Sequence, residues 1–168
     1  MGASGEKWET VGISHSLPTR AKRGAVGGYL GSHLNQMDEK GRVTLPAAFR
    51  KNSDGASFVL IQVHPDALTL YPIETWEDVE KRMRDHLRRA PQRRLEFLAL
   101  TSRAQEVTPD KQGRILISER LRSAIELHGE ALLIGALDKI EIWSPAKFEE
   151  IVEDGPGDLG DVAGRLFA

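Results

Sequence analysis

The sequence contains no cysteine, few aromatic residues and no long apolar run. Without cysteine the chain forms neither a disulfide nor a thiolate metal site, and nothing in it requires an oxidising compartment. Only 6% of the 168 residues are aromatic, so we expect a modest core. No stretch approaches the roughly 20 apolar residues of a membrane helix, and the N-terminus lacks the apolar part of a signal peptide. We therefore expect a soluble cytoplasmic protein without a membrane partner.

The residue patterns of common catalytic and cofactor sites are also missing. The five histidines, at positions 15, 33, 64, 86 and 128, share no metal-ligand spacing. The glycine-rich stretch Gly24–Gly28 has neither the pattern of a nucleotide-binding fingerprint nor a strand before it. The sequence therefore predicts no enzymatic activity, no cofactor or metal, and no small-molecule ligand.

What the sequence does contain is an internal repeat. The segment Asp38–Leu45 (DEKGRVTL) returns 72 residues later as Asp110–Ile117 (DKQGRILI). The flanking residues follow at the same offset without insertion or deletion, which a chance match of one motif would not produce. Equivalent pairs include Phe49 with Leu121, Arg50 with Arg122, Leu68 with Ile140, Leu70 with Ile142, and Tyr71 with Trp143. The chain therefore consists of two related modules.

Each copy of the motif has the residues of a tight turn between two strands. An aspartate accepts hydrogen bonds from backbone N–H groups a few residues on, and glycine adopts a positive φ without steric cost. Arg42 and Arg114 follow directly after the turn tips. One interpretation is that each arginine pairs with its own aspartate, an exposed contact worth about 0–1 kcal/mol. The other is that the arginines face a ligand, which the duplication and the basic surroundings favour.

Each module predicts the same order of elements: strand, turn, strand, short helix, β-hairpin and longer helix. The expected strands are 29–37, 42–45, 58–63, 68–71, 103–107, 114–117, 131–136 and 139–143, and the expected helices are 46–51, 73–89, 95–100, 119–125 and 145–152. Ser118 and Ser144 are expected to cap two of the helices. Residues 1–28 are expected to be a flexible tail, 29–100 the first module with connecting helices, 101–152 the second module, and 153–168 an acidic tail. We expect an α+β fold in which the two modules pack around a pseudo-two-fold axis.

The charges are segregated, although the net charge is only −2. Residues 81–94 hold seven basic residues against Asp85, while residues 153–168 hold four acidic residues against Arg165. Residues 29–98 carry +1 and residues 99–152 carry −2, so the first module is the better candidate for contact with a polyanion. The basic cluster at 81–94 fits three interpretations. A solvated helix face or a contact between protomers is favoured over contact with phosphates.

Four motifs resemble the MraZ family of bacterial transcriptional regulators. They are Asp-x-Lys-Gly-Arg-Val-Thr-Leu-Pro-Ala-x-Phe-Arg from Asp38, Leu-Tyr-Pro-x-x-x-Trp-Glu from Leu70, Gln-Gly-Arg-Ile-Leu-Ile from Gln112, and Ile-Glu-Ile-Trp from Ile140. The resemblance runs from residue 29 to about residue 153. It implies two tandem AbrB-type (SpoVT-AbrB) swapped-hairpin modules and ring-shaped homo-oligomers. It also implies binding to repeated operator elements near the division and cell-wall gene cluster, usually with repression, and hence a nucleoid-associated protein.

The resemblance also marks site residues and departures. The Asp-x-x-x-Arg motif of the family falls on Asp38 and Arg42 and on Asp110 and Arg114. The first 27 residues have no counterpart in the family, Leu30 replaces a residue that is often basic, and Ser118 replaces the usual proline. An AbrB-type antitoxin-like module that binds a protein is the alternative. It is disfavoured because both halves are folded copies and no disordered half is left for a toxin.

Double-stranded DNA is therefore the expected partner, together with further copies of the chain. We expect Arg42 to read a base, because an arginine fork matches guanine O6 and N7 and discriminates by about 1–3 kcal/mol. Lys40 is expected to meet a phosphate. The full set of expected DNA-contacting residues is Asp38, Lys40, Arg42, Arg50, Lys51, Asp110, Lys111 and Arg114. Since the net charge is close to zero, affinity is expected to come from several protomers that engage spaced sites together.

Overall fold

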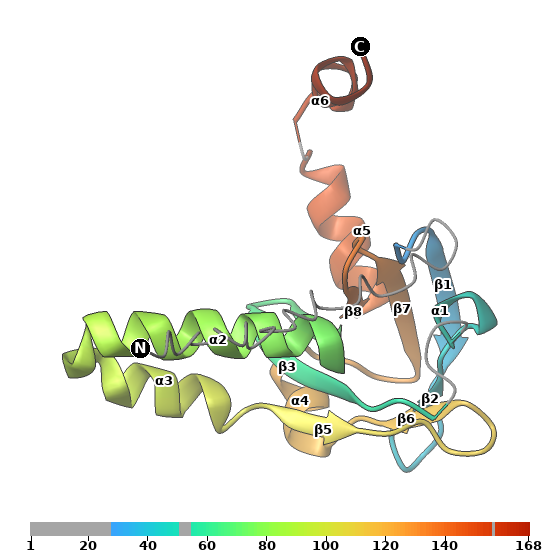
Figure 1. The fold of residues 1–168 in the computed structure, drawn as a ribbon. Coiled ribbons are helices and arrows are strands. Elements are labelled where there is room, and N and C mark those ends of the chain that lie inside the picture. Colours follow the sequence, from blue (N-terminus) through green and yellow to red (C-terminus); the bar gives the residue numbers. More distant parts are fainter. Residues whose placement is uncertain (1–27, 51–54, 156) are drawn as a thin grey trace, which may run out of the picture.

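The computed structural model describes residues 28–50, 55–155 and 157–168, and its elements follow the predicted order (Figure 1). The strands are β1 (Ser32–Gln36), β2 (Arg42–Thr44), β3 (Phe58–His64), β4 (Ala67–Pro72), β5 (Gln105–Val107), β6 (Arg114–Leu116), β7 (Glu130–Gly135) and β8 (Ile140–Trp143). The helices are α1 (Ala47–Arg50), α2 (Ile73–Arg89), the 3-10 turn η1 (Pro91–Arg93), α3 (Arg94–Thr101), α4 (Glu119–Ala124), α5 (Pro145–Glu153) and α6 (Leu159–Phe167). Apart from Gly28, the segment predicted to be an N-terminal tail lies outside the described residues, as does Lys51.

Six strands form one antiparallel sheet in the order β1-β7-β8-β4-β3-β5. The two predicted hairpins, β3–β4 and β7–β8, are both present and meet where β4 pairs with β8. In this central pairing Leu68 lies opposite Ile142 and Leu70 opposite Ile140. The offset of 72 residues exchanges these two pairs, so the pseudo-two-fold axis passes between β4 and β8. The predicted α+β fold with two repeated modules is confirmed.

The strands next to the turns pair across the modules. β1 pairs with β7, β5 pairs with β3, and β2 pairs with β6 in a separate two-stranded ribbon. Within the described part of the first module no ladder pairs β1 with β2; they are linked by the isolated bridge between Met37 and Val43 and by a hydrogen bond from Asn35 Nδ2 to the Thr44 carbonyl oxygen. The turn therefore forms as predicted, but its strands diverge into the partner module. This exchange agrees with the swapped hairpins that the resemblance implied. It has a simple reason, because a module of about 60 residues buries too little surface alone.

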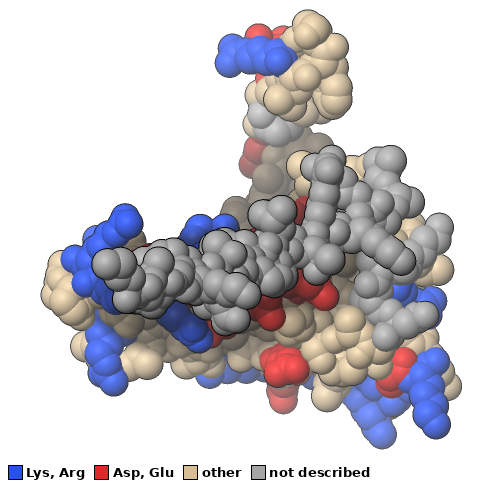
Figure 2. Space-filling view, viewed as in Figure 1, with Lys and Arg blue, Asp and Glu red and all other residues tan. Residues whose placement is uncertain are grey.

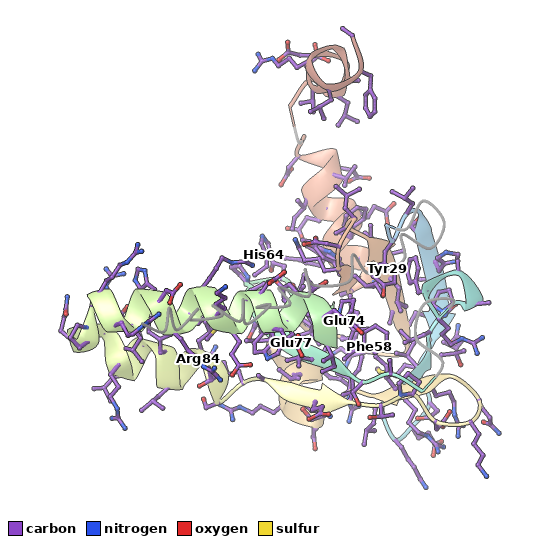
Figure 3. All side chains as sticks on the ribbon, in the orientation of Figure 1. Tyr29, Phe58, His64, Glu74, Glu77 and Arg84 are labelled. Carbon is purple, nitrogen blue, oxygen red and sulfur yellow. The ribbon has the colours of Figure 1, made fainter. Side chains whose placement is uncertain are left out.

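The core is built from equivalent residues of both modules. Buried apolar pairs related by the offset include Val43 with Ile115, Leu45 with Ile117, and Phe49 with Leu121. Tyr29 packs its ring edge-on against Phe49, with the ring centroids 5.7 Å apart. Partial burial of Tyr29 raises the pKa of its hydroxyl, and the nearby Glu74 carboxylate makes a smaller contribution in the same direction (Figure 3). At the position of Phe49 the second module has the aliphatic Leu121, so this aromatic packing is specific to the first module.

The helices hold the differences between the two modules. Helix α2 has 17 residues and forms a projecting hairpin with α3, whereas the equivalent α5 has nine residues (Figure 1). The predicted apolar stripe of α2 is only half-buried. Ser118 and Ser144 occupy the N-cap positions of α4 and α5, but neither side chain makes the expected capping hydrogen bond.

The C-terminal segment differs from the sequence-based expectation. Residues 153–168 were expected to be an acidic tail, and they contain the helix α6. The Asp158 carboxylate caps this helix by accepting hydrogen bonds from the backbone N–H groups of Gly160 and Asp161. The apolar residues of this segment recur at helical spacing, but its glycines and acidic residues favoured a tail. Among the helices of the described residues, none has the length and hydropathy needed to cross a bilayer.

Candidate nucleic-acid interface

The first repeated turn is closed by the side chain of Asp38. Its Oδ1 accepts hydrogen bonds from the backbone N–H of Lys40 at 3.0 Å and of Arg42 at 2.8 Å. The Gly41 N–H donates to the Asp38 carbonyl oxygen at 3.0 Å, and Gly41 has a φ of 86°. The positive φ and the carboxylate contacts are those that the motif predicted.

The second turn reproduces this geometry. Asp110 Oδ1 accepts from the backbone N–H of Gln112 and of Arg114, both at 2.9 Å. Gly113 donates to the Asp110 carbonyl oxygen at 2.9 Å and has a φ of 75°. Each motif residue therefore has the same local role in both modules.

Each turn aspartate also holds the arginine that follows the turn. Arg42 Nε donates to Asp38 Oδ2 at 2.6 Å, and Arg114 Nε donates to Asp110 Oδ2 at 2.8 Å. The ion-pair interpretation of the motif is thus confirmed. It is compatible with the ligand interpretation, because within the described residues neither arginine uses Nη1 or Nη2 in a hydrogen bond. Those two nitrogens form a fork that recognises guanine or phosphate in a bidentate manner.

The two arginines lie on the same face of the β2–β6 ribbon. Val43 and Ile115 point into the core, so the residues on either side of them point outward. Arg42 is paired with Leu116 and Arg114 with Thr44, which offsets the arginines by two residues, or about 7 Å, along the strands. Their side chains are 34% and 27% exposed. The ribbon therefore presents two oriented guanidinium groups on one surface.

Further basic side chains surround this face. Lys40 and Lys111 are exposed in the two turns. Figure 2 shows Lys and Arg side chains gathered at the lower right, over the region of the β2 and β6 turns in Figure 1, beside a small acidic group. The structure thus brings together six of the predicted residues: Asp38, Lys40, Arg42, Asp110, Lys111 and Arg114.

Arg50, also expected at DNA, contacts the turn of the other module. Its Nε donates to the Leu45 carbonyl oxygen at 2.9 Å. Its guanidinium lies against Gly113, where an added Cβ would be 2.6 Å from Arg50 Nη1. Arg122 does the same in the second module, with a 3.0 Å bond to the Ile117 carbonyl oxygen and its guanidinium against Gly41. The equivalence of the two arginines at the offset was the signal in the sequence, but only the exchanged strands reveal these contacts.

Both turn aspartates have a lowered pKa. The backbone N–H of Arg42 contributes most to lowering the pKa of Asp38, and the Arg42 guanidinium adds to it. The backbone N–H of Arg114 and then its guanidinium lower the pKa of Asp110 in the same way. Since the folded pKa lies below the ordinary 3.8, these carboxylates stabilise the fold above that pH. The contribution is lost as the pH falls through the lower, folded pKa.

We therefore expect the double variant Asp38→Asn with Asp110→Asn to lose less stability on acidification than the original chain. The amide oxygens still accept the backbone hydrogen bonds of the turns, but they carry no charge to titrate. Melting temperatures measured from pH 7 to pH 2 test this, and the two proteins should converge below pH 4. Parallel curves over the whole range would show that the turns do not govern the acid response.

The described residues suggest no metal centre beside the ribbon. Within residues 28–50, 55–155 and 157–168, no group of three or more His, Asp or Glu side chains is arranged to hold a metal ion. The oriented donors are instead guanidinium and ammonium groups, whose natural counterparts are phosphate and carboxylate oxygens and the acceptors of base edges.

Comparisons with known proteins agree with this arrangement. The family model of the MraZ protein, whose description also carries the words "antitoxin-like", matches residues 29–98 and 100–156. Curated relatives named "Transcriptional regulator MraZ" include those of Acidithiobacillus ferrooxidans, 34% identical over 148 residues, and Pediococcus pentosaceus, 31% identical over 139 residues. These alignments cover 80% and 83% of this chain and 98% and 96% of the relatives. Both matched regions contain one turn and its arginine, and the chain therefore belongs to the MraZ family.

Proposed function

We propose that the protein is a sequence-specific DNA-binding transcriptional regulator that acts at the nucleoid, in the cytoplasm. The observation that carries this proposal is the β2–β6 ribbon, with two arginines on one face whose Nη groups are not engaged by the described protein. A two-stranded β ribbon fits the major groove, where base pairs are fully distinguishable. The curated relatives are named as transcriptional regulators, which supports the same class of function.

In this proposal Arg42 reads a guanine and Asp38 orients it. Fixing Nε by the carboxylate removes much of the side-chain freedom that the arginine would otherwise lose on binding. Lys40 and Lys111 contact phosphates and set the register of the ribbon on the duplex. Arg50 acts mainly by holding the second turn, and Lys51 follows it in the sequence as a further phosphate contact.

The proposal includes homo-oligomerisation into a ring. A protomer with a net charge of −2 gains little from general attraction to DNA, so one ribbon binds weakly. Several ribbons in a closed assembly bind repeated operator elements at a high effective concentration. Repression of the division and cell-wall gene cluster, with operators near its start, is the function that the family resemblance supports.

Two measurements test this proposal, and the first is salt dependence. With Lys40 and Lys111 of two protomers on phosphates, log K should fall with log salt at a slope of about −4. Electrophoretic mobility shifts of the upstream region over a salt series give this slope. A flat response would show that the lysines in the turns do not meet phosphates.

The second measurement is dependence on the number of operator repeats. We expect DNA with two or more correctly spaced repeats to bind at least about a hundredfold more tightly than DNA with one, as linked sites do. Titration against fragments that differ only in repeat number provides the comparison, and fragments with altered spacing are the matched control. Equal affinity for one and several repeats would rule out avidity.

The two turns are not expected to contribute equally. Arg42 belongs to the half with net charge +1 and has Lys40 in its turn, whereas Arg114 belongs to the half at −2 and Gln112 replaces Lys40. We expect Arg114→Ala to weaken operator binding about tenfold or less, and Arg42→Ala to weaken it more. Titrations of both single variants on one operator decide this. Equal losses would mean that both modules read DNA, and a larger loss for Arg114→Ala would reverse the assignment.

Binding of a protein, as in an antitoxin, remains the second candidate because of the words in the family description. The two candidates differ in what the arginine fork recognises. In an antitoxin the arginine fork would bind carboxylates of a partner protein. Duplex DNA bound at another surface would not displace that partner. If the unmodified chain does not bind duplex DNA of its own upstream region even at low salt, this second candidate is favoured.

A further inference from the structure

Helix α6 carries an exposed apolar face. Leu159, Val162, Leu166 and Phe167 recur at spacings of three, four and one residues, which places them on one side of a helix. No residue of α6 is buried, and Leu166 is 70% exposed. The helix lies beyond the region matched by the family model, which ends at residue 156. Such a face needs a partner, since a nine-residue helix is marginal in water by itself.

A largely apolar groove lies between α2 and α3. It has a volume of about 260 Å³ and is lined by Met83, Leu87, Phe97 and Leu98, with Arg84 and Arg94 among the charged residues at its sides. Leu98 is 46% exposed there. Figure 3 shows Arg84 in the region where the two helices face each other. Arg84 pairs with Glu80, whereas the side chain of Arg94 forms no hydrogen bond or ion pair within the described residues.

The charges of the two surfaces are complementary. The charged residues that line the groove are Arg84 and Arg94, from the basic cluster of residues 81–94, and one acid, Glu80. The segment 153–168 holds four acids against one base, and Asp158 and Asp161 lie in the first turn of α6 or at its cap. Apolar contact flanked by opposite charges favours one orientation of docking and speeds association. The acidity of α6 also disfavours an anionic membrane surface as its partner.

The geometry points to a second copy of the chain as the occupant. Figure 1 shows α6 beyond the far end of α5, while the α2–α3 hairpin projects in a different direction. Only residues 154–158 connect α5 to α6, a reach of about 17 Å at full extension. We propose that α6 of one protomer docks its apolar face into the α2–α3 groove of its neighbour, with Arg94 of the groove facing the acidic start of α6. This inference rests on the self-association proposed above and names one contact between the protomers.

Because the 168 residues contain no cysteine, crosslinking of single-cysteine variants of the whole chain is a direct test. One variant carries Ala163→Cys on the apolar side of α6, and a second carries Thr101→Cys at the groove. The two are mixed without DNA and treated with a short bismaleimide. We expect a covalent heterodimer. Leu95→Cys is the matched control for the groove, because Leu95 lies on the same helix, is 74% exposed and does not line the groove.

A second pair of variants tests the helix face. Adding Leu166→Asp to the Ala163→Cys chain should lower the crosslink yield about tenfold, the effect of losing one buried leucine contact. Gly164→Asp adds the same charge on the opposite side of α6, where an added Cβ meets no neighbour, and should leave the yield unchanged. Equal yields with Leu95→Cys, insensitivity to Leu166→Asp, or a crosslink formed only within a doubly substituted chain would overturn the proposal.

Sedimentation velocity of the same mixtures distinguishes failure of α6 docking from failure of self-association. If the mixture sediments as an oligomer but yields no heterodimer crosslink, the docking of α6 is overturned and the proposed assembly stands. A monomer under all conditions overturns both. Efficient crosslinking of Ala163→Cys with itself would mean that two α6 helices pair with each other, which also overturns the groove as the occupied surface.

Discussion

Replacing Arg42 by alanine is expected to abolish sequence-specific DNA binding while leaving the fold and the assembly intact. The arginine is one third exposed, and its side chain bonds to Asp38 alone within the described residues. Its loss removes a bidentate contact worth about 1–3 kcal/mol at every operator element that the oligomer engages. Since several elements bind together, we expect operator affinity to fall at least about a hundredfold. Titration of a fluorescent operator measures this loss, and melting temperature and sedimentation confirm that the fold and the assembly are retained.

Arg42→Lys is the matched control for this prediction. Lysine keeps the positive charge but offers no planar fork, so general affinity for DNA should survive while discrimination between operator and random DNA is lost. The ratio of the two affinities, measured at one salt concentration, is the decisive quantity. Unchanged operator affinity in Arg42→Ala would show that the ribbon does not read DNA.

Replacing Gly41 by valine is expected to destabilise the whole chain strongly. Gly41 has a φ of 86°, which a β-branched residue adopts only with strain. An added Cβ would also lie 2.6 Å from Arg122 Nε and 2.8 Å from the Ile117 carbonyl oxygen, both in the second module. We expect strain and collision to cost about 3 kcal/mol together, which lowers the melting temperature by about 10 °C.

Gly31→Val separates the backbone strain from the steric collision. Gly31 also has a φ of 86°, but an added Cβ would meet no atom within 4 Å. This variant should therefore show the conformational strain alone and lose clearly less stability than Gly41→Val. Thermal unfolding followed by circular dichroism compares the two. An undiminished melting temperature in Gly41→Val would mean that the turn accepts another conformation.

The sequence predicted the elements well because they depend on local patterns. The stripe of Trp76, Val79 and Met83 predicted the long helix α2, and the structure has it over the predicted residues. The motif residues Asp38 and Gly41 predicted a turn with a positive φ, which is confirmed. These features depend on contacts within a few residues, and such contacts are visible in a sequence.

Local sequence patterns did not predict which distant strands pair. Nothing in the three residues of β2 indicates that they pair with β6, because alternation specifies only which side chains point inward. For the same reason the sequence did not predict that the Arg50 guanidinium lies against Gly113 of the other module. The capping role of Ser118 failed differently. A serine at an N-cap position has a preference but no obligation to use its hydroxyl.

The exchanged strands have a consequence for how the chain folds during synthesis. His33 of β1 pairs with Leu133 of β7, a partner made 100 residues later. At a synthesis rate of about 5–20 residues per second, β1 lacks its partner strand for roughly 5–20 s. In the same way β2 has no partner until β6 is made. Neither strand edge is covered in the meantime, and open edges pair readily with other chains. The native fold is therefore closed only after the second module emerges, so contacts of high sequence separation govern its folding rate.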